Sequence, residues 1–175
     1  LAKLSQVKTC EKYLLYAEKC YKFIINNMIN DDGILLHRYM EGKAGINSKL
    51  DDYSFLIWGI TELYESTLNI EYLIKAKEFG LQAIDLFYDN DNGGFFISSK
   101  QDTDLIYRKK DIYDGAIPSG NSILIIYLLI LSKYLDNNIF KIIAEKSLQF
   151  FSANINEYPV GYTKVINSIY YLFNK

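Results

Sequence analysis

The stretch YDGAIPSGNS, Tyr113–Ser122, stands directly before Ile123–Leu131, in which every residue is apolar. Pro118 cannot lie inside a helix and restricts the residue before it to extended backbone. Ser119 and Asn121 have short polar side chains that accept hydrogen bonds from the free N–H groups at a helix start. The stretch therefore predicts the beginning of a buried helix, with polar groups presented beside it.

Two kinds of helix alternate along the chain. The segments Asp52–Ser66 and Ile123–Leu131 carry apolar residues on more than one side, which is typical of buried helices. From Leu73 to Phe87 the apolar residues form a single stripe, as in a half-exposed outer helix. This alternation predicts concentric layers of inner and outer helices.

A short pattern repeats within these helices. An aromatic residue stands four positions before an alanine in Tyr13–Ala17, Tyr72–Ala76 and Phe140–Ala144, at intervals of roughly 60 residues. Such a period suits a pair of helices with one short and one long connection. We therefore expect a single all-α domain over residues 1–175, a partial α/α toroid of about three helical hairpins.

In a toroid the inner helices point their starts at a common mouth. The expected starts are Leu50–Tyr53, Pro118–Ser122 and Pro159–Thr163, and each start offers unpaired N–H groups with a partial positive charge. The segments Gly94–Ser98 and Leu105–Arg108 are rich in β-forming residues and flank a polar turn. They predict a short β-hairpin inserted in a long loop.

Composition restricts the classes of partner. The 175 residues are 50% hydrophobic and 15% aromatic, with a net charge of −2 and no basic face, so we expect no nucleic-acid partner. The longest apolar run is well short of the roughly 20 residues that span a bilayer, and no signal peptide is recognised. We therefore expect a cytoplasmic location without a membrane anchor.

Neither a metal nor a cofactor is expected. One histidine and two scattered cysteines cannot supply a zinc site. On one helix, Cys10 and Cys20 would be roughly 15 Å apart, too far for a disulfide. Both are expected to be small buried hydrophobic residues.

Several motifs together resemble one family. They are LDDYSFL at residues 50–56, LYE at 63–65, LIYR at 105–108 and the opening stretch at 113–122. These motifs resemble the large thioredoxin-domain-containing proteins, including their spermatogenesis-associated relatives, whose C-terminal part is a six-hairpin-glycosidase-like α/α toroid. The resemblance implies that this chain is a C-terminal portion of such a toroid. It contains no counterpart of the thioredoxin domain, and Leu1–Val7 resembles the second half of an inner helix.

The same resemblance suggests a carbohydrate-like ligand, because fold relatives include glycosidases and sugar 2-epimerases. Glycoside hydrolysis needs two carboxyl groups about 5 to 10 Å apart. The catalytic candidates are Asp114 with Asp51 or Asp52, at neighbouring helix starts. Helix starts favour the ionised form, which suits a base or nucleophile and leaves the acid unassigned. Those epimerases rely on paired histidines, whereas this chain has only His37, expected in a solvated loop.

Further residues are candidates for binding a ligand at this mouth. Arg38 and Arg108 are the only arginines, and each can clamp an aspartate or an anionic ligand, or else form a structural Arg–Asp pair. The other candidates are Tyr53, Tyr113, Ser119 and Asn121, whereas Trp58 is expected in the core.

Two functions remain open at this point. The first is binding or processing of a carbohydrate-like molecule in the parent protein, with the isolated fragment inactive. The second is a non-catalytic helical scaffold or protein-interaction module. Because a partial ring leaves apolar faces uncovered, we also expect self-association or pairing with the rest of the toroid.

Overall fold

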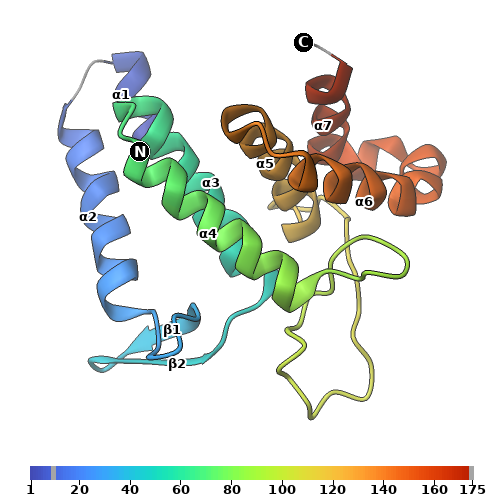
Figure 1. Cartoon of the computed structure of the whole chain (residues 1–175), viewed down its shortest axis with the longest axis horizontal. Coiled ribbons are helices and arrows are strands. Elements are labelled where there is room, and N and C mark those ends of the chain that lie inside the picture. The colour runs from blue at the N-terminus through green and yellow to red at the C-terminus, as the bar shows by residue number, and fades with distance from the viewer. Residues whose placement is uncertain (9–10, 174–175) are drawn as a thin grey trace.

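The computed structural model describes residues 1–8 and 11–173, which fold into helices with one small β-hairpin (Figure 1). The elements in chain order are α1 (Ala2–Lys8), α2 (Glu11–Asn27), β1 (Leu36–Met40), β2 (Lys43–Asn47), α3 (Leu50–Thr67), α4 (Ile70–Phe87), α5 (Gly120–Leu135), α6 (Asn138–Glu157), the 3-10 helix η1 (Pro159–Tyr162) and α7 (Thr163–Phe173). The prediction of a mostly helical fold is confirmed, whereas the partial α/α toroid stays a prediction.

The helices pack as a row. Helices α1, α3, α5 and α7 contact one another in that order, and α2, α4 and α6 lie beside them. Figure 1 shows α1 and α2 at one end of this row and α6 and α7 at the other, with α3 and α4 between them. Helix α5 is buried almost throughout its first ten residues, while α4 buries one stripe.

Local signals set the helix boundaries. Ser119 caps α5, because its side chain accepts a hydrogen bond from the backbone N–H of Ser122 at 3.1 Å. Asn69 and Asn137 cap α4 and α6 in the same way. Leu68 and Asp136 adopt left-handed backbone at the ends of α3 and α5, which stops each helix and starts its connection.

The β-hairpin lies at a different place from the predicted one. Strands β1 and β2 pair antiparallel around Glu41 and Gly42, which both have positive φ, as a two-residue hairpin turn requires. The predicted strands Gly94–Ser98 and Leu105–Arg108 do not pair. Instead, Phe95 and Phe96 form isolated bridges with Tyr88 and Lys110, and Leu105, Ile106 and Tyr107 are exposed apolar residues.

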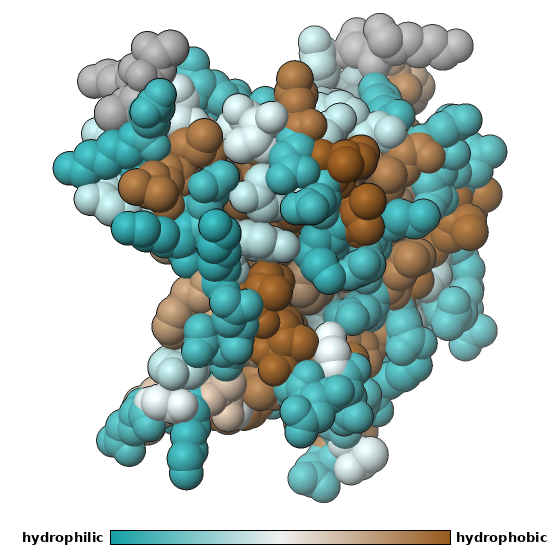
Figure 2. Space-filling view, turned by 60° about the vertical axis from the view of Figure 1, so that its left-hand side comes forward, coloured by the Kyte–Doolittle hydropathy of each residue, from teal (hydrophilic) through white to brown (hydrophobic). Residues whose placement is uncertain are grey.

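Helix α2 differs from the other long helices in its packing. None of its residues is buried, and Leu15, Tyr16 and Phe23 are exposed. Figure 2, which brings this side forward, shows apolar side chains gathered among hydrophilic ones. Cys20 on α2 is exposed, so its expected burial is wrong, and Cys10 lies outside the described residues. Within the described parts of the chain, no helix combines the length and apolar character needed to cross a membrane.

Candidate functional site

The starts of α5 and α7 are joined by one carboxylate. Asp114, in the loop before α5, accepts the backbone N–H of Ser119 at 3.0 Å through Oδ1. Its Oδ2 accepts the backbone N–H of Lys164, in the first turn of α7, at 2.7 Å. Asp114 thus satisfies free amides at two helix starts that are far apart in the sequence.

A second carboxylate joins α3 to the same place. The backbone N–H of Gly120 hydrogen-bonds the carboxylate of Asp51, in the first turn of α3. A side chain at position 120 would be blocked, because a Cβ there would lie 2.3 Å from Asp51 Oδ1. Since Asp51 and Asp114 bind consecutive amides, their carboxylates lie within roughly 10 Å of each other.

Asp51 differs from an ordinary surface carboxyl. Partial burial raises its pKa above the usual 3.8, and the negative charges of Asp52 and Asp111 act in the same direction. The hydrogen bond from Gly120 opposes this shift without cancelling it. The helix-start argument alone predicts the opposite direction, and it is wrong for this residue because desolvation is the larger effect.

Asp52 completes the start of α3. Its Oδ2 accepts the backbone N–H of Lys49 at 2.7 Å and lies 2.8 Å from Nδ1 of His37. His37 is solvent-exposed, as expected, but it lies on β1 rather than in a loop and is held by this carboxylate. We call Asp51, Asp52, Asp114 and the amides of Ser119, Gly120 and Lys164 the helix-start site.

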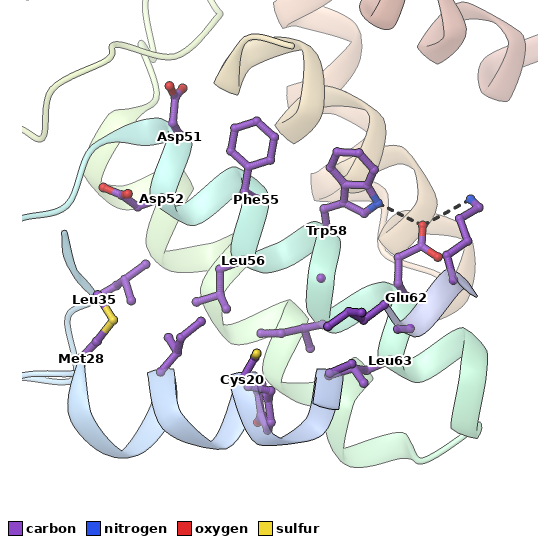
Figure 3. Close-up of a pocket in the computed structure, with 18 of the residues that line it drawn as sticks. Cys20, Met28, Leu35, Asp51, Asp52, Phe55, Leu56, Trp58, Glu62 and Leu63 are labelled. Carbon is purple, nitrogen blue, oxygen red and sulfur yellow. Dashed lines mark hydrogen bonds and ion pairs between the residues drawn. The ribbon is translucent and has the colours of Figure 1, made fainter. Parts of the chain in front are cut away.

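A cavity of about 690 Å³ extends from the helix-start site along α3. Asp51, Phe55, Trp58 and Glu62 line it from one side of α3, because their spacing of four, three and four residues places them on one helix face (Figure 3). Leu56 and Leu63 point toward α2 in the same view. Residues on other elements complete the lining: Leu1, Ala2, Lys3, Ala17, Cys20, Tyr21, Ile24, Met28, Leu35, Leu36, His37 and Ile117.

Aromatic rings form a continuous surface on this face. The rings of Phe55 and Trp58 stack with centres 6.1 Å apart, and Trp58 stacks on Tyr127 of α5 at 5.8 Å. The ammonium of Lys164 lies 4.8 Å from the centre of the Trp58 ring. Trp58 therefore lines the cavity and is only partly buried, contrary to the expectation that it is a core residue.

Asp51, Phe55, Trp58 and Glu62 form a row on α3 that we call the α3 stripe. Glu62, at the other end of this stripe from Asp51, was not predicted from the sequence. Its Oε1 receives hydrogen bonds from Lys3 at 3.4 Å, Trp58 Nε1 at 3.0 Å and the Tyr127 hydroxyl at 3.1 Å. The helical spacing from Asp51 was a signal that could have found it. Asp51 and Glu62 are eleven residues apart, or roughly 16 Å along the helix, which is too far for a hydrolytic carboxyl pair.

Arg108 lies away from the helix-start site. Its guanidinium donates to the carbonyl oxygen of Ser98 at 2.7 Å and to that of Leu86 at 3.1 Å, and it lies 4.2 Å from the centre of the Phe96 ring. The predicted clamp on a carboxylate is wrong, because Arg108 instead fixes the loop to the end of α4. It lines a second cavity of about 410 Å³ together with Tyr113.

Three of the predicted ligand residues have structural contacts. Tyr53 is fully buried, and its hydroxyl accepts from the Leu35 N–H at 3.3 Å and donates to Gln82. Asn121 is fully buried and is bound to the backbone of Phe95 and Asp111. Ser119 is the cap of α5, and its amide belongs to the helix-start site.

The remaining predicted residues are at the surface. Arg38 is exposed on β1, and Tyr113 is exposed with its ring edge against Tyr162. Across residues 1–8 and 11–173, no group of three or more histidine, cysteine, aspartate or glutamate side chains is arranged to hold a metal ion. The structure thus brings together Asp51, Asp52, Asp114 and Ser119, and separates them from Arg108.

Comparisons with known proteins bear on the family. No protein-family model matches the chain. It is 35% identical over 174 residues to an uncharacterised protein of Caenorhabditis elegans, an alignment that covers 94% of this chain and 23% of that protein. It is 31% identical over 169 residues to spermatogenesis-associated protein 20 of Mus musculus, covering 91% and 21%. The human protein of that name is 30% identical over 123 residues.

These similarities support the spermatogenesis-associated family that the motifs indicate. The chain spans less than a quarter of the length of these curated relatives. The similarities therefore concern one part of each of these longer relatives.

Proposed function

We propose that the cavity along α3 binds a carbohydrate-like small molecule, with the helix-start site at its mouth. The observation that carries this proposal is the α3 stripe, which places two stacked aromatic rings between the carboxylates of Asp51 and Glu62. Sugar rings present C–H groups to aromatic faces and hydroxyl groups to carboxylates, so both parts of this surface fit one ligand.

The carboxyl groups at the mouth suggest what a longer protein does with such a ligand. Asp51, whose pKa is raised by partial burial, would be the proton donor, and Asp114, whose two oxygens accept backbone amides, would be the second carboxyl group. Their separation of at most roughly 10 Å is compatible with the spacing in glycoside hydrolases. We infer that the chain described here binds without turnover, because Asp51 lines the cavity whereas Asp114 does not.

Binding can be followed with the only tryptophan of the chain, Trp58, which lies on the cavity wall. Titration with a panel of mono- and disaccharides is expected to change its fluorescence in a saturable way. Asp51→Asn is expected to weaken that response, whereas Asp85→Asn, in an exposed ion pair with Lys100, is the control. An unchanged emission spectrum with every saccharide would refute the proposal.

A second candidate function is a helical scaffold, and the packing of α2 favours it. This helix exposes Leu15, Tyr16 and Phe23, and exposed apolar surface of this kind favours association. We expect the average mass from light scattering to rise with concentration. Phe23→Glu should abolish the rise, and a constant monomer mass for the unaltered chain would contradict this candidate.

A further inference from the structure

Glu62 is a buried acid whose hydrogen bonding is incomplete. Only 6% of the residue is exposed, and its Oε1 already accepts three hydrogen bonds (Figure 3). Its Oε2 is buried and has no hydrogen-bond partner among the described residues. A buried carboxylate oxygen without a partner is costly, so this atom favours an additional donor.

The charge of Glu62 is also poorly compensated. Its ion-pair partner is Lys3, at 3.4 Å, and 72% of the Lys3 side chain is exposed. The other cation on this face, Lys164, is bound over the Trp58 ring rather than to Glu62. A buried carboxylate that has one weakly bound, solvated cation can exchange it for a better placed one.

The groups around Glu62 suit an ammonium ion. The indole N–H of Trp58 and the hydroxyl of Tyr127 both donate to Glu62, and the two rings stack on each other, so the polar edges of the rings meet the carboxylate. Burial and the negative charge of Glu62 raise the pKa of Tyr127, which keeps its hydroxyl as a donor. A carboxylate in such a partly desolvated wall forms strong charge-assisted hydrogen bonds with a primary ammonium group.

We propose that Glu62 binds a primary ammonium group of the ligand, so that the cavity takes an amino sugar in preference to a neutral sugar. This inference rests on the proposed function, because it assumes that the ligand lies along the α3 stripe. In the bound state the ammonium takes the place of Lys3 at Oε1 and also donates to Oε2, while Lys3 moves into solvent. A neutral hydroxyl at the same place would form the hydrogen bond but would not compensate the charge.

Isothermal titration calorimetry with glucosamine, glucose and N-acetylglucosamine tests this preference. Glucosamine is expected to bind roughly ten- to a hundred-fold more tightly than glucose, the difference that a charge-assisted hydrogen bond provides. N-acetylglucosamine has a similar shape but no cation, so it is expected to bind no more tightly than glucose.

Two variants separate recognition from a structural role. Glu62→Gln keeps the shape of the side chain and should remove the preference for glucosamine, so that the ratio of the glucosamine and glucose affinities falls to about one. Lys3→Ala should do the opposite and strengthen glucosamine binding several-fold, because it removes the competing ammonium. Lys12→Ala on α2, where Lys12 lies over the Tyr16 ring, is the matched control and should change neither.

The outcomes distinguish the two proposals. If glucose and glucosamine bind equally, or if Lys3→Ala leaves glucosamine binding unchanged, the role of Glu62 is wrong while the sugar-binding cavity stands. If none of the three sugars binds, both proposals are wrong. Because Lys3 is exposed, its variant remains informative even if Glu62→Gln fails to fold.

Discussion

The helix-start site and the Arg108 cluster both gather charged side chains, but they use them differently. We define the Arg108 cluster as Arg108, Lys110, Asp89 and the rings of Phe96 and Phe150. In this cluster Lys110 pairs with Asp89 at 2.7 Å, donates to the carbonyl of Gly93 and lies 3.8 Å from the centre of the Phe150 ring. Every cation there is engaged with backbone, ring or carboxylate.

The helix-start site gathers acids instead. Asp51, Asp52 and Asp114 accept backbone amides at three helix starts, and no arginine is present among them. Acids that are placed together and held mainly by backbone amides are a feature of binding and catalytic sites, whereas satisfied ion pairs order loops. A charged residue in a loop therefore indicates a functional site only once its hydrogen-bond and ion-pair partners are known.

The largest expected effect concerns Asn121, which anchors the Arg108 cluster's loop to α5. Asn121→Ala leaves the Phe95 N–H and the carbonyls of Phe95 and Asp111 without their side-chain partner. The free energy of unfolding in urea is expected to fall by about 3 kcal/mol or more. Asn138→Ala, at an exposed site at the start of α6, is the control. A loss below 1 kcal/mol would contradict the anchoring role.

Removal of the Arg108 guanidinium should have a smaller effect, confined to stability. Arg108→Ala loses the hydrogen bonds to Ser98 and Leu86, and should lower the free energy of unfolding by about 1 to 3 kcal/mol. Arg108→Lys should recover only part of this, because an ammonium lacks the planar fork. Saccharide binding to the folded fraction should not change. Loss of binding with full stability would place Arg108 in the ligand site after all.

Gly120→Ala should lower saccharide binding as well as stability. The added methyl group would lie 2.3 Å from Asp51 Oδ1, 3.0 Å from Leu50 Cγ and 3.2 Å from the Asp51 backbone nitrogen, so the start of α3 must shift. The free energy of unfolding is therefore expected to fall by about 1 to 2 kcal/mol. Saccharide affinity should fall about tenfold or more as Asp51 leaves its place. Gly45→Ala on β2, outside the cavity and with no atom within 4 Å of the new methyl group, is the control.

The smallest expected effect is an opposite pH dependence of stability for two acids. Because the pKa of Asp51 is raised in the folded state, its contribution to the free energy of unfolding is present below pH 3.8 and is lost as pH rises through the raised pKa. For Asp89, burial raises the pKa, but hydrogen bonds from Lys110, Asn92 and two backbone amides together lower it by more, so the pKa lies below its usual value. Its contribution is present above 3.8 and is lost as pH falls.

Unfolding curves of Asp51→Asn and Asp89→Asn between pH 3 and 7 should show these slopes. The stability of the unaltered chain relative to Asp51→Asn should decrease with rising pH, and relative to Asp89→Asn it should increase. Slopes of the same sign would remove the electrostatic difference between the two regions.

The sequence predicted the helices better than the site. Apolar stripes and the Pro118–Ser119 start set α5 correctly, because burial and capping are local properties of the sequence. The predicted strand at Gly94–Ser98 was wrong because tertiary contacts decide that segment. Its backbone is held by Arg108 and Asn121, which approach from elsewhere in the chain.

The candidate site shows the same division. Asp51, Asp52 and Asp114 could be predicted from their positions at helix starts. The role of Asn121 could not, because polar residues beside a helix start serve caps, ligands and buried loop contacts alike. Glu62 was missed because it lies in the middle of a helix and its exposure depends on how α1 and α5 pack around it.

If the starts of α3, α5 and α7 form one ligand site, a saccharide must affect all three together. Backbone amide NMR spectra of the chain, recorded with and without a saccharide, measure this. The amides of Ser119, Gly120 and Lys164, which bind Asp114 and Asp51, are expected to shift together on titration, whereas those of Phe95 and Ile97 stay in place. Shifts confined to the loop around Phe95, or independent titration of Gly120 and Lys164, would contradict a single ligand site.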